Sequence, residues 1–328
     1  MALDPQASRF LERLHRLNLP PIWEIGEAAI REAQWEESAA AAFTPDPRFT
    51  AITDVVISRD LEVIDERPVV SATSAQPLVA NHGQLTVRRY EPVGSNGDVC
   101  IYFHGGGWVI GSVVFFDPLV RELALASGMT FVSVEYRLSP EHPFPAATLD
   151  AELALRWVQS QVADGGKIAV AGDSAGANLA AALCLMTRDC GEPLPAAQVL
   201  FYPVTDADFE RPSYLANREG YFLSRQDMQW FWSQYVAEPE ERLNPYASPL
   251  QGELGGLPPA RICVAGHDPL HDEGRLYAEK LVAAGVAVDF VEYPGMIHGF
   301  VKRFPEFEAG RTEIREAGQF LRRVLGER

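Results

Sequence analysis

The residues most suited to chemistry form the run Gly172-Asp173-Ser174-Ala175-Gly176. The run follows a short apolar stretch and opens an alanine-rich one, so it predicts a strand, a sharp turn and a helix. A turn this tight needs glycines, because it leaves no room for Cβ atoms near the serine. The turn presents the hydroxyl beside a helix N-terminus, which stabilises negative charge. The pattern predicts that Ser174 is a nucleophile and that Asp173 points away and stabilises the turn.

A serine hydroxyl is a weak nucleophile, so it needs a base, and the base needs an acid to orient it. Asp268 follows the predicted strand 261–265, and His298 lies in the loop after the next predicted strand. Carboxyl ends of parallel strands meet at one rim of a sheet, where Ser174 is also expected. Asp272 is a rival acid one helical turn further on, but it is predicted to face along the helix. Asp268 is therefore the preferred partner of His298.

The negative oxygen that forms when a serine attacks a carbonyl needs hydrogen-bond donors already aimed at it. Ala175 can donate its peptide N–H at the start of the predicted helix. The run 104–108, His-Gly-Gly-Gly-Trp, follows a predicted strand, and its glycines allow close approach of the backbone. We expect Gly105 and Gly106 to supply the other donors. The ring of His104 is expected to buttress the glycine loop rather than to react.

Five stretches make this chain similar to the hormone-sensitive-lipase-like family (family IV) of bacterial carboxylesterases, within the α/β-hydrolase superfamily. They are 104–108, 136–146, 172–176, 268–272 and 298–300, and the likeness extends over about 50–325. In that superfamily the acid follows the serine and the histidine follows the acid, which is the order found here. Two residues depart from the family pattern: Ala177 stands where a third glycine is usual, and His271 where an arginine is common. His271 and His267 are both expected at the surface.

The resemblance implies a Ser-His-Asp triad, an oxyanion hole and no metal or organic cofactor. The implied triad is Ser174, His298 and Asp268, and the implied oxyanion donors are Gly105, Gly106 and Ala175. The expected activity is hydrolysis of short- to medium-chain acyl esters through an acyl-enzyme, and the family also admits a homodimer through the last strand or helix. An amidase with the same triad, a triglyceride lipase and a non-catalytic receptor on the same scaffold are alternatives. Such receptors typically lose the histidine, which this chain keeps.

The pattern of apolar segments predicts an α/β fold. From residue 98 onward, short apolar strands alternate with helices, which indicates a mainly parallel sheet covered by helices on both faces. Two helical patterns, 5–19 and 22–43, come first, and valine-rich segments at 53–63 and 84–90 are typical of strands. The later predicted strands are 99–103, 130–136, 167–171, 198–202, 261–265 and 286–293.

One segment, 206–249, interrupts this alternation with two helical stretches rich in aromatic residues. With the N-terminal helices it is interpreted as a cap over the carboxyl ends of the strands, where such folds bind ligands. Ligand pockets are largely apolar and aromatic, so Trp108, Tyr202 and Phe222 are candidates for substrate contact. The predicted parts are 1–48 (N-terminal cap), 49–205 (first part of the core), 206–249 (cap insertion) and 250–328 (second part of the core).

Composition excludes several classes of partner. The net charge of −17 would repel nucleic acid and anionic membranes. No apolar run approaches the roughly 18 residues of a membrane span, and the N-terminus lacks the pattern of a signal peptide. The scattered cysteines, with Cys100 and Cys263 in predicted buried strands, favour reduced thiols in the cytoplasm, and Cys184 and Cys190 lack the histidines of a metal site. We expect a cytoplasmic enzyme whose partner is a small ester.

Overall fold

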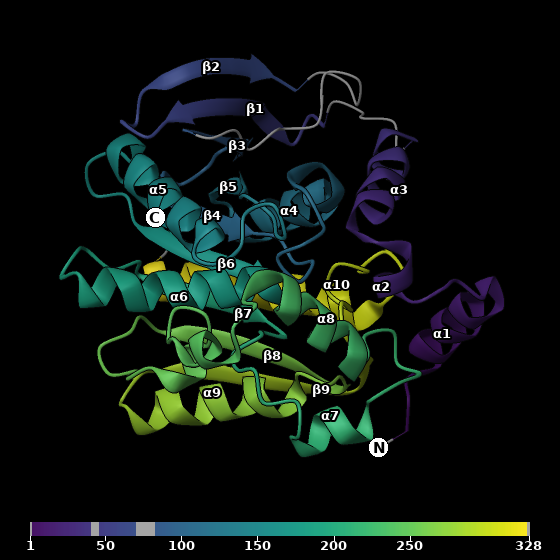
Figure 1. Cartoon of the computed structure of the whole chain (residues 1–328). Coiled ribbons are helices and arrows are strands. Elements are labelled where there is room, and N and C mark those ends of the chain that lie inside the picture. The colour runs from purple at the N-terminus through teal and green to yellow at the C-terminus, as the bar shows by residue number, and fades with distance from the viewer. Residues whose placement is uncertain (1, 41–45, 70–82, 327–328) are drawn as a thin grey trace.

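Nine strands form one sheet in the computed structural model, which describes residues 2–40, 46–69 and 83–326 (Figure 1). The order across the sheet is β2-β1-β3-β5-β4-β6-β7-β8-β9. Pairing is antiparallel from β2 to β5 and parallel from there to β9, so the predicted mainly parallel sheet is confirmed. The strands are β1 (Phe49–Ser58), β2 (Val63–Pro68), β3 (Gln84–Pro92), β4 (Val99–Phe103), β5 (Thr130–Glu135), β6 (Ile168–Asp173), β7 (Ala197–Phe201), β8 (Ala260–His267) and β9 (Val288–Ile297).

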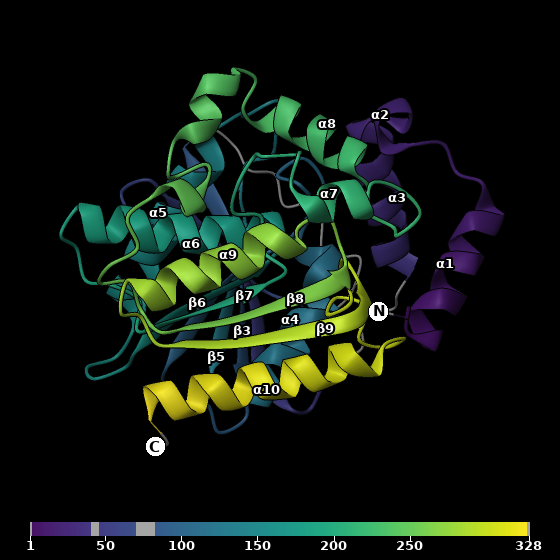
Figure 2. The ribbon, with the colours of Figure 1, turned by 90° about the horizontal axis from the view of Figure 1, so that it is seen from below.

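Helices cover both faces of the sheet (Figure 2). Helices α4 (Val113–Ser127) and α10 (Glu308–Leu325) lie on one face. Helices α5 (Ala146–Gln161), α6 (Ala175–Asp189) and α9 (His271–Ala283) lie on the other. Because successive strand residues point to opposite faces, the strands other than β2, whose residues are all exposed, contribute to two separate apolar cores. Strands β4 to β8 are buried on both faces, which explains why they are almost continuously apolar.

The predicted cap comprises helices from two distant parts of the chain. Its N-terminal part is α1 (Pro5–Leu17), α2 (Ile22–Ile25) and α3 (Glu27–Ala40). Its second part holds α7 (Pro212–Ala216) and α8 (Arg225–Tyr235), the two helices predicted for 206–249. Short 3₁₀ turns follow at Pro239–Leu243 and Pro249–Gln251. Helices α2 and α8 are in contact, so the two parts meet beside the sheet (Figures 1 and 2).

Two predicted elements are wrong in extent. The predicted helix 22–43 is broken at Gly26, whose φ of 80° is not helical, so α2 and α3 are separate; residues 41–43 lie outside the described part. The predicted single strand 53–63 is in fact two strands: its first part is the end of β1, and its last residue is the first of β2. A turn with Leu61 at φ 66° separates the two strands. Gly26 and Leu61 each have a positive φ, which ends a helix or a strand. The hydrophobic pattern does not reveal such a backbone conformation, so the predicted elements continue through it.

Arg137 and Glu141, which carry opposite charges in the run 136–146, do not pair with each other. Arg137 donates to the carboxylate of Asp150 in α5 at 2.7 Å, and the pair is buried. Glu141 instead pairs with Arg31 of α3 at 2.7 Å. The run 136–146 therefore connects the core to the N-terminal cap helix.

Candidate active site

The turn around Ser174 joins the end of β6 directly to the start of α6. Ser174 has φ 54° and ψ −119°, a strained conformation for a residue with a side chain. A Cβ atom on Gly176 would lie 2.0 Å from the carbonyl oxygen of Phe103, and one on Gly172 would lie 2.4 Å from the backbone of Gly176. The Ser174 N–H donates to the carbonyl of Phe201 in β7 at 2.9 Å. The two glycines are therefore required by close backbone packing, as the sequence predicts.

Ser174, His298 and Asp268 form one chain of hydrogen bonds. The His298 Nε2 atom lies 3.0 Å from Ser174 Oγ, and its Nδ1 atom lies 2.7 Å from Asp268 Oδ2. A carboxylate only accepts, so the ring proton lies on Nδ1 and Nε2 is left to accept from the serine hydroxyl. Asp268 has no exposed surface, and its other oxygen accepts from the N–H of Leu270 at 2.9 Å. The imidazole thus links the hydroxyl to a fixed carboxylate.

The parallel register brings these side chains together. Asp268 directly follows β8, and His298 directly follows β9. The last paired residues of these strands are His267 and Ile297, so the two side chains emerge at neighbouring strand ends. Ser174 emerges from β6 at the same rim, two strands away. Three positions far apart in the sequence therefore meet because each ends a parallel strand.

The rival carboxylate, Asp272, is occupied elsewhere. It lies in α9, where one of its oxygens accepts from the N–H of Ser213 at 2.9 Å and the other contacts His271. His271 and His267 are half-buried rather than at the surface, so that expectation is wrong. His267 stacks on Tyr221 of the cap insertion, and His271 lies between Asp272 and the strand β9.

Gly105 does not have a free N–H. It donates to Asp173 Oδ1 at 2.8 Å, and the same oxygen accepts from the hydroxyl of Tyr102 at 2.7 Å. Burial raises the pKa of Asp173 to about 6, while these hydrogen bonds oppose the shift. The prediction that Gly105 is an oxyanion donor is therefore wrong in this conformation, because its proton is already bound. Asp173 points away from the site, as predicted, and its contact is with the glycine loop.

Three other peptide groups remain available. Among the described residues, the N–H groups of Gly106 and Gly107 have no hydrogen-bond partner. Ala175 is the first residue of α6, and its N–H also lacks a partner within the described chain. Gly106 and Gly107 have φ of 122° and 59°, which favour glycine. Gly107 is not among the oxyanion donors expected from the sequence. Its place as the third glycine of the run 104–108 could have indicated this role.

His104 supports this loop from below. Its ring stacks on Tyr136 at 4.3 Å and on Phe116 at 5.5 Å, and its Nδ1 donates to the carbonyl of Gly105 at 2.8 Å. Tyr136 donates its hydroxyl proton to the His104 carbonyl at 2.7 Å. Complete burial lowers the pKa of His104 to about 4, so the ring is neutral at ordinary pH. The predicted buttressing contact is confirmed.

The three aromatic candidates for substrate contact have different surroundings. Trp108 is fully buried and stacks on Tyr235 of α8 at 4.1 Å, so it has no surface left for a ligand and that prediction is wrong. Tyr202 is 1% exposed and lies behind His298 at 4.8 Å, so it too belongs to the packing around the site. Phe222 is 40% exposed and lies edge-on to Phe10 of α1 at 5.7 Å. Only Phe222 of these three retains a surface on which a substrate could pack.

No metal site accompanies this arrangement in the described ranges. Those residues contain no group of three or more His, Cys, Asp or Glu side chains that could hold a metal ion. The four cysteines are free thiols, and of them only Cys190 is exposed. Across the same described residues, no helix has both the length and the apolar composition of a membrane span.

This chain is similar to known α/β-hydrolases and esterases. A family described as alpha/beta hydrolase fold matches residues 100–302. Carboxylesterase NlhH of Mycobacterium tuberculosis is 43% identical over 227 residues, which cover 66% of this chain and 71% of that protein. Ethyl acetate hydrolase of Pseudomonas putida is 41% identical over 248 residues, covering 72% and 78%. The structure of a hyperthermophilic esterase from Pyrobaculum calidifontis superposes with a TM-score of 0.84, at 36% identity and over 99% of this chain and 100% of that one.

Proposed function

This chain belongs to the hormone-sensitive-lipase-like family of α/β-hydrolases, and we propose that Ser174, His298 and Asp268 form its catalytic triad. The enzyme is a carboxylic-ester hydrolase. The observation that carries the triad proposal is the continuous hydrogen-bond chain from Ser174 Oγ through both nitrogens of His298 to Asp268. A serine hydroxyl so connected loses its proton to the imidazole as it attacks.

The proposed reaction proceeds through an acyl-enzyme. Ser174 Oγ bonds to the ester carbonyl carbon while His298 Nε2 takes the hydroxyl proton. The carbonyl oxygen becomes negative and accepts hydrogen bonds from the peptide groups of Ala175, Gly106 and Gly107, whose protons are otherwise unused. The C–O bond of the ester then breaks, and His298 returns its proton to the leaving alcohol. Water repeats the sequence on the acyl-enzyme and releases the acid.

We propose short- to medium-chain acyl esters as the substrates. Hydrolysis of ethyl acetate, named for one relative, is consistent with a short acyl group. The half-exposed Phe222 offers an apolar surface close to His298, since its ring would lie 3.5 Å from a Cβ atom on Gly299. A panel of p-nitrophenyl esters from acetate to palmitate measures the preferred chain length, and a maximum at palmitate would contradict the proposal.

Covalent labelling tests the nucleophile directly. A fluorophosphonate probe should label the wild-type protein once, at Ser174, and should not label Ser174→Ala. The variant should lose about 10⁶-fold in kcat on p-nitrophenyl butyrate, as triad knockouts do. Ser233→Ala is the matched control, because this exposed serine lies on α8 with its hydroxyl bonded to Trp230. Activity of Ser174→Ala close to wild type would overturn the assignment.

Matched esters and amides separate an esterase from an amidase with the same triad. We expect kcat/KM on p-nitrophenyl butyrate to exceed that on the butyryl p-nitroanilide, because an amine is the poorer leaving group. The reverse order would favour the amidase. Absence of activation at an oil–water interface would exclude a triglyceride lipase.

We also propose a cytoplasmic location and a homodimer. Unpaired cysteines support the first, since disulfides form mainly in oxidising compartments. The second is supported by β9, which is an edge strand with Phe290 37% exposed on it. Cell fractionation and light scattering are the respective tests.

A further inference from the structure

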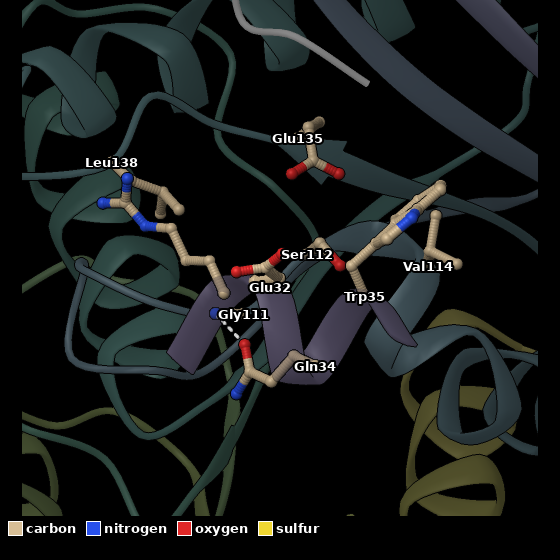
Figure 3. A pocket seen from close by; sticks show the side chains of 9 residues that line it. Glu32, Gln34, Trp35, Gly111, Ser112, Val114, Glu135 and Leu138 are labelled. Carbon is tan, nitrogen blue, oxygen red and sulfur yellow. Dashed lines mark hydrogen bonds between the residues drawn. The ribbon is translucent and has the colours of Figure 1, made fainter. Parts of the chain in front are cut away.

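A cavity of about 370 Å³ lies between α3 of the cap and the start of α4 (Figure 3). Its walls include Glu32 and Trp35 from α3, Ser112 and Val114 at the start of α4, and Glu135 and Leu138 from the end of β5 and the loop after it. None of the triad residues lines this cavity. It is therefore separate from the proposed catalytic centre.

Glu135 gives the cavity a polar end. This side chain is only 6% exposed, and Figure 3 shows its carboxyl group pointing into the cavity. Its Oε2 atom accepts from the N–H of Val113 at 2.8 Å, whereas Oε1 has no partner among the described residues. This carboxyl group can therefore accept a hydrogen bond from a ligand in the cavity.

The ionisable side chains of the cavity wall are those of Arg31, Glu32 and Glu135. The guanidinium of Arg31 is already bound to the carbonyls of Val109 and Ser139 and to both carboxylate oxygens of Glu141. Glu32 has no such cation beside it among the described residues, and its carboxylate points toward the cavity in Figure 3. A cation would therefore meet two carboxyl groups and no unpaired positive charge.

We propose that this cavity binds a small organic ammonium ion with an apolar body. The ammonium group donates to Glu135 Oε1 and to the Glu32 carboxylate. The body packs against the ring of Trp35 and against Val114 and Leu138, and an indole face also attracts cations. The volume accommodates a group the size of phenethylammonium.

Occupation of the cavity would connect the cap to the glycine loop. Gln34 of α3 already accepts from the N–H of Gly111 at 2.9 Å, and Gly111 follows the loop that holds Gly106 and Gly107. A ligand between Glu32 and Glu135 would add a second connection across the same boundary. Ligand binding to the folded state only would also raise the melting temperature.

Titration calorimetry with phenethylammonium tests the proposal, with 2-phenylethanol as its neutral counterpart. We expect one molecule of the cation to bind, and the alcohol to bind at least about tenfold more weakly, since a hydrogen bond to a charged group is lost. At pH 9, where Glu135 is ionised, Glu135→Gln keeps the acceptor for Val113 and should weaken cation binding by at least about tenfold. Glu32→Gln, on the exposed rim, should weaken it by about threefold. Glu36→Gln, exposed on α3 outside the cavity wall, is the matched control and should bind like wild type.

The binding constant should also depend on pH. Burial raises the pKa of Glu135 to about 8; Arg88 of β3 opposes this shift and Asp54 of β1 adds to it. An alkylammonium ion, like lysine, stays charged to about pH 10, so binding should strengthen about tenfold between about pH 6.5 and 8.5. Glu135→Gln should remove this pH dependence. The variant keeps the other charged groups at the cavity, Arg31 and Glu32.

Three results would overturn the proposal: no measurable binding of the cation, equal binding of the alcohol, or unchanged binding in both Glu135→Gln and Glu32→Gln. Circular dichroism of each variant establishes that it is folded. No ester is hydrolysed in these measurements, so their outcome is independent of the proposed triad.

Discussion

The carboxylate of Asp173 accepts a hydrogen bond from the peptide N–H of Gly105 at 2.8 Å. The residue before the proposed nucleophile thereby holds the loop that carries two proposed oxyanion donors. A Cβ atom on Gly105 would lie 2.4 Å from the same carboxylate, so the contact leaves no room for a side chain. This buried carboxylate thus helps His104 and Tyr136 to hold the loop that carries the donors.

Replacing Asp173 should impair catalysis through this contact. Asp173→Ala removes the acceptor for Gly105 and Tyr102, and we expect kcat on p-nitrophenyl butyrate to fall roughly tenfold to a hundredfold as the donors shift. Asp173→Asn keeps an acceptor oxygen and should stay within about threefold of wild type. If Asp173→Ala retained wild-type kcat while folded, the contact would have no role in positioning the loop.

Arg31 should stabilise the docking of α3 on the core. Its bonds to the carbonyls of Val109 and Ser139 are charge-assisted, whereas its partner Glu141 is 53% exposed and contributes little in water. Arg31→Ala should therefore lower the free energy of unfolding by about 2 kcal/mol. Arg31→Lys should rescue only part of this, because an ammonium group lacks the planar fork.

Urea denaturation measures the change, and Arg16→Ala is the control, since Arg16 is 80% exposed on α1. Equal stability of Arg31→Ala and Arg16→Ala would show that the cap does not depend on these bonds.

Phe222 should affect long acyl chains more than short ones. It is the only one of the three aromatic candidates with exposed surface, and each methylene packed against it is worth up to about 0.8 kcal/mol. Phe222→Ala should lower kcat/KM for the hexanoate ester several-fold and leave the acetate ester nearly unchanged. Leu215→Ala, half-exposed on α7, is the control. A uniform loss across chain lengths would argue against contact with the acyl group.

Glu135 should make the protein less stable as pH rises. Burial holds its pKa at about 8 in the folded state against 4.5 in the ordinary case, so between these values the unfolded chain releases a proton that the folded chain keeps. The contribution of Glu135 to the free energy of unfolding is greatest below about pH 4.5 and is lost as the pH rises to 8. At about 1.4 kcal/mol per pKa unit, the loss amounts to at most a few kcal/mol.

Glu135→Gln cannot titrate and should lose less stability over this interval in urea denaturation series. Other buried carboxyl groups, Asp173 and Glu313 among them, titrate in both proteins and cancel in the comparison. Parallel curves for the variant and the wild type would contradict the raised pKa of Glu135.

The sequence alone determined the structural elements that depend on residues close together in the chain. Glycines around Ser174 and alternating apolar strands and helices specify the turn and the parallel sheet, because both depend on residues that are neighbours in the chain. Strand order then places Asp268 and His298 at the rim of Ser174, since parallel strands end on one side. The three proposed catalytic positions could therefore be identified before any distance was known.

Only the tertiary structure decided which peptide N–H groups already have hydrogen-bond partners and which aromatic side chains are buried. Gly105 and Gly107 are indistinguishable in a run of three glycines, and the difference comes from Asp173, which binds the N–H of Gly105. Trp108 and Phe222 are both aromatic, yet packing on Tyr235 buries the first completely and leaves the second 40% exposed. Hydrogen-bond partners and exposure depend on residues distant in the chain, so residue type and spacing do not encode them locally.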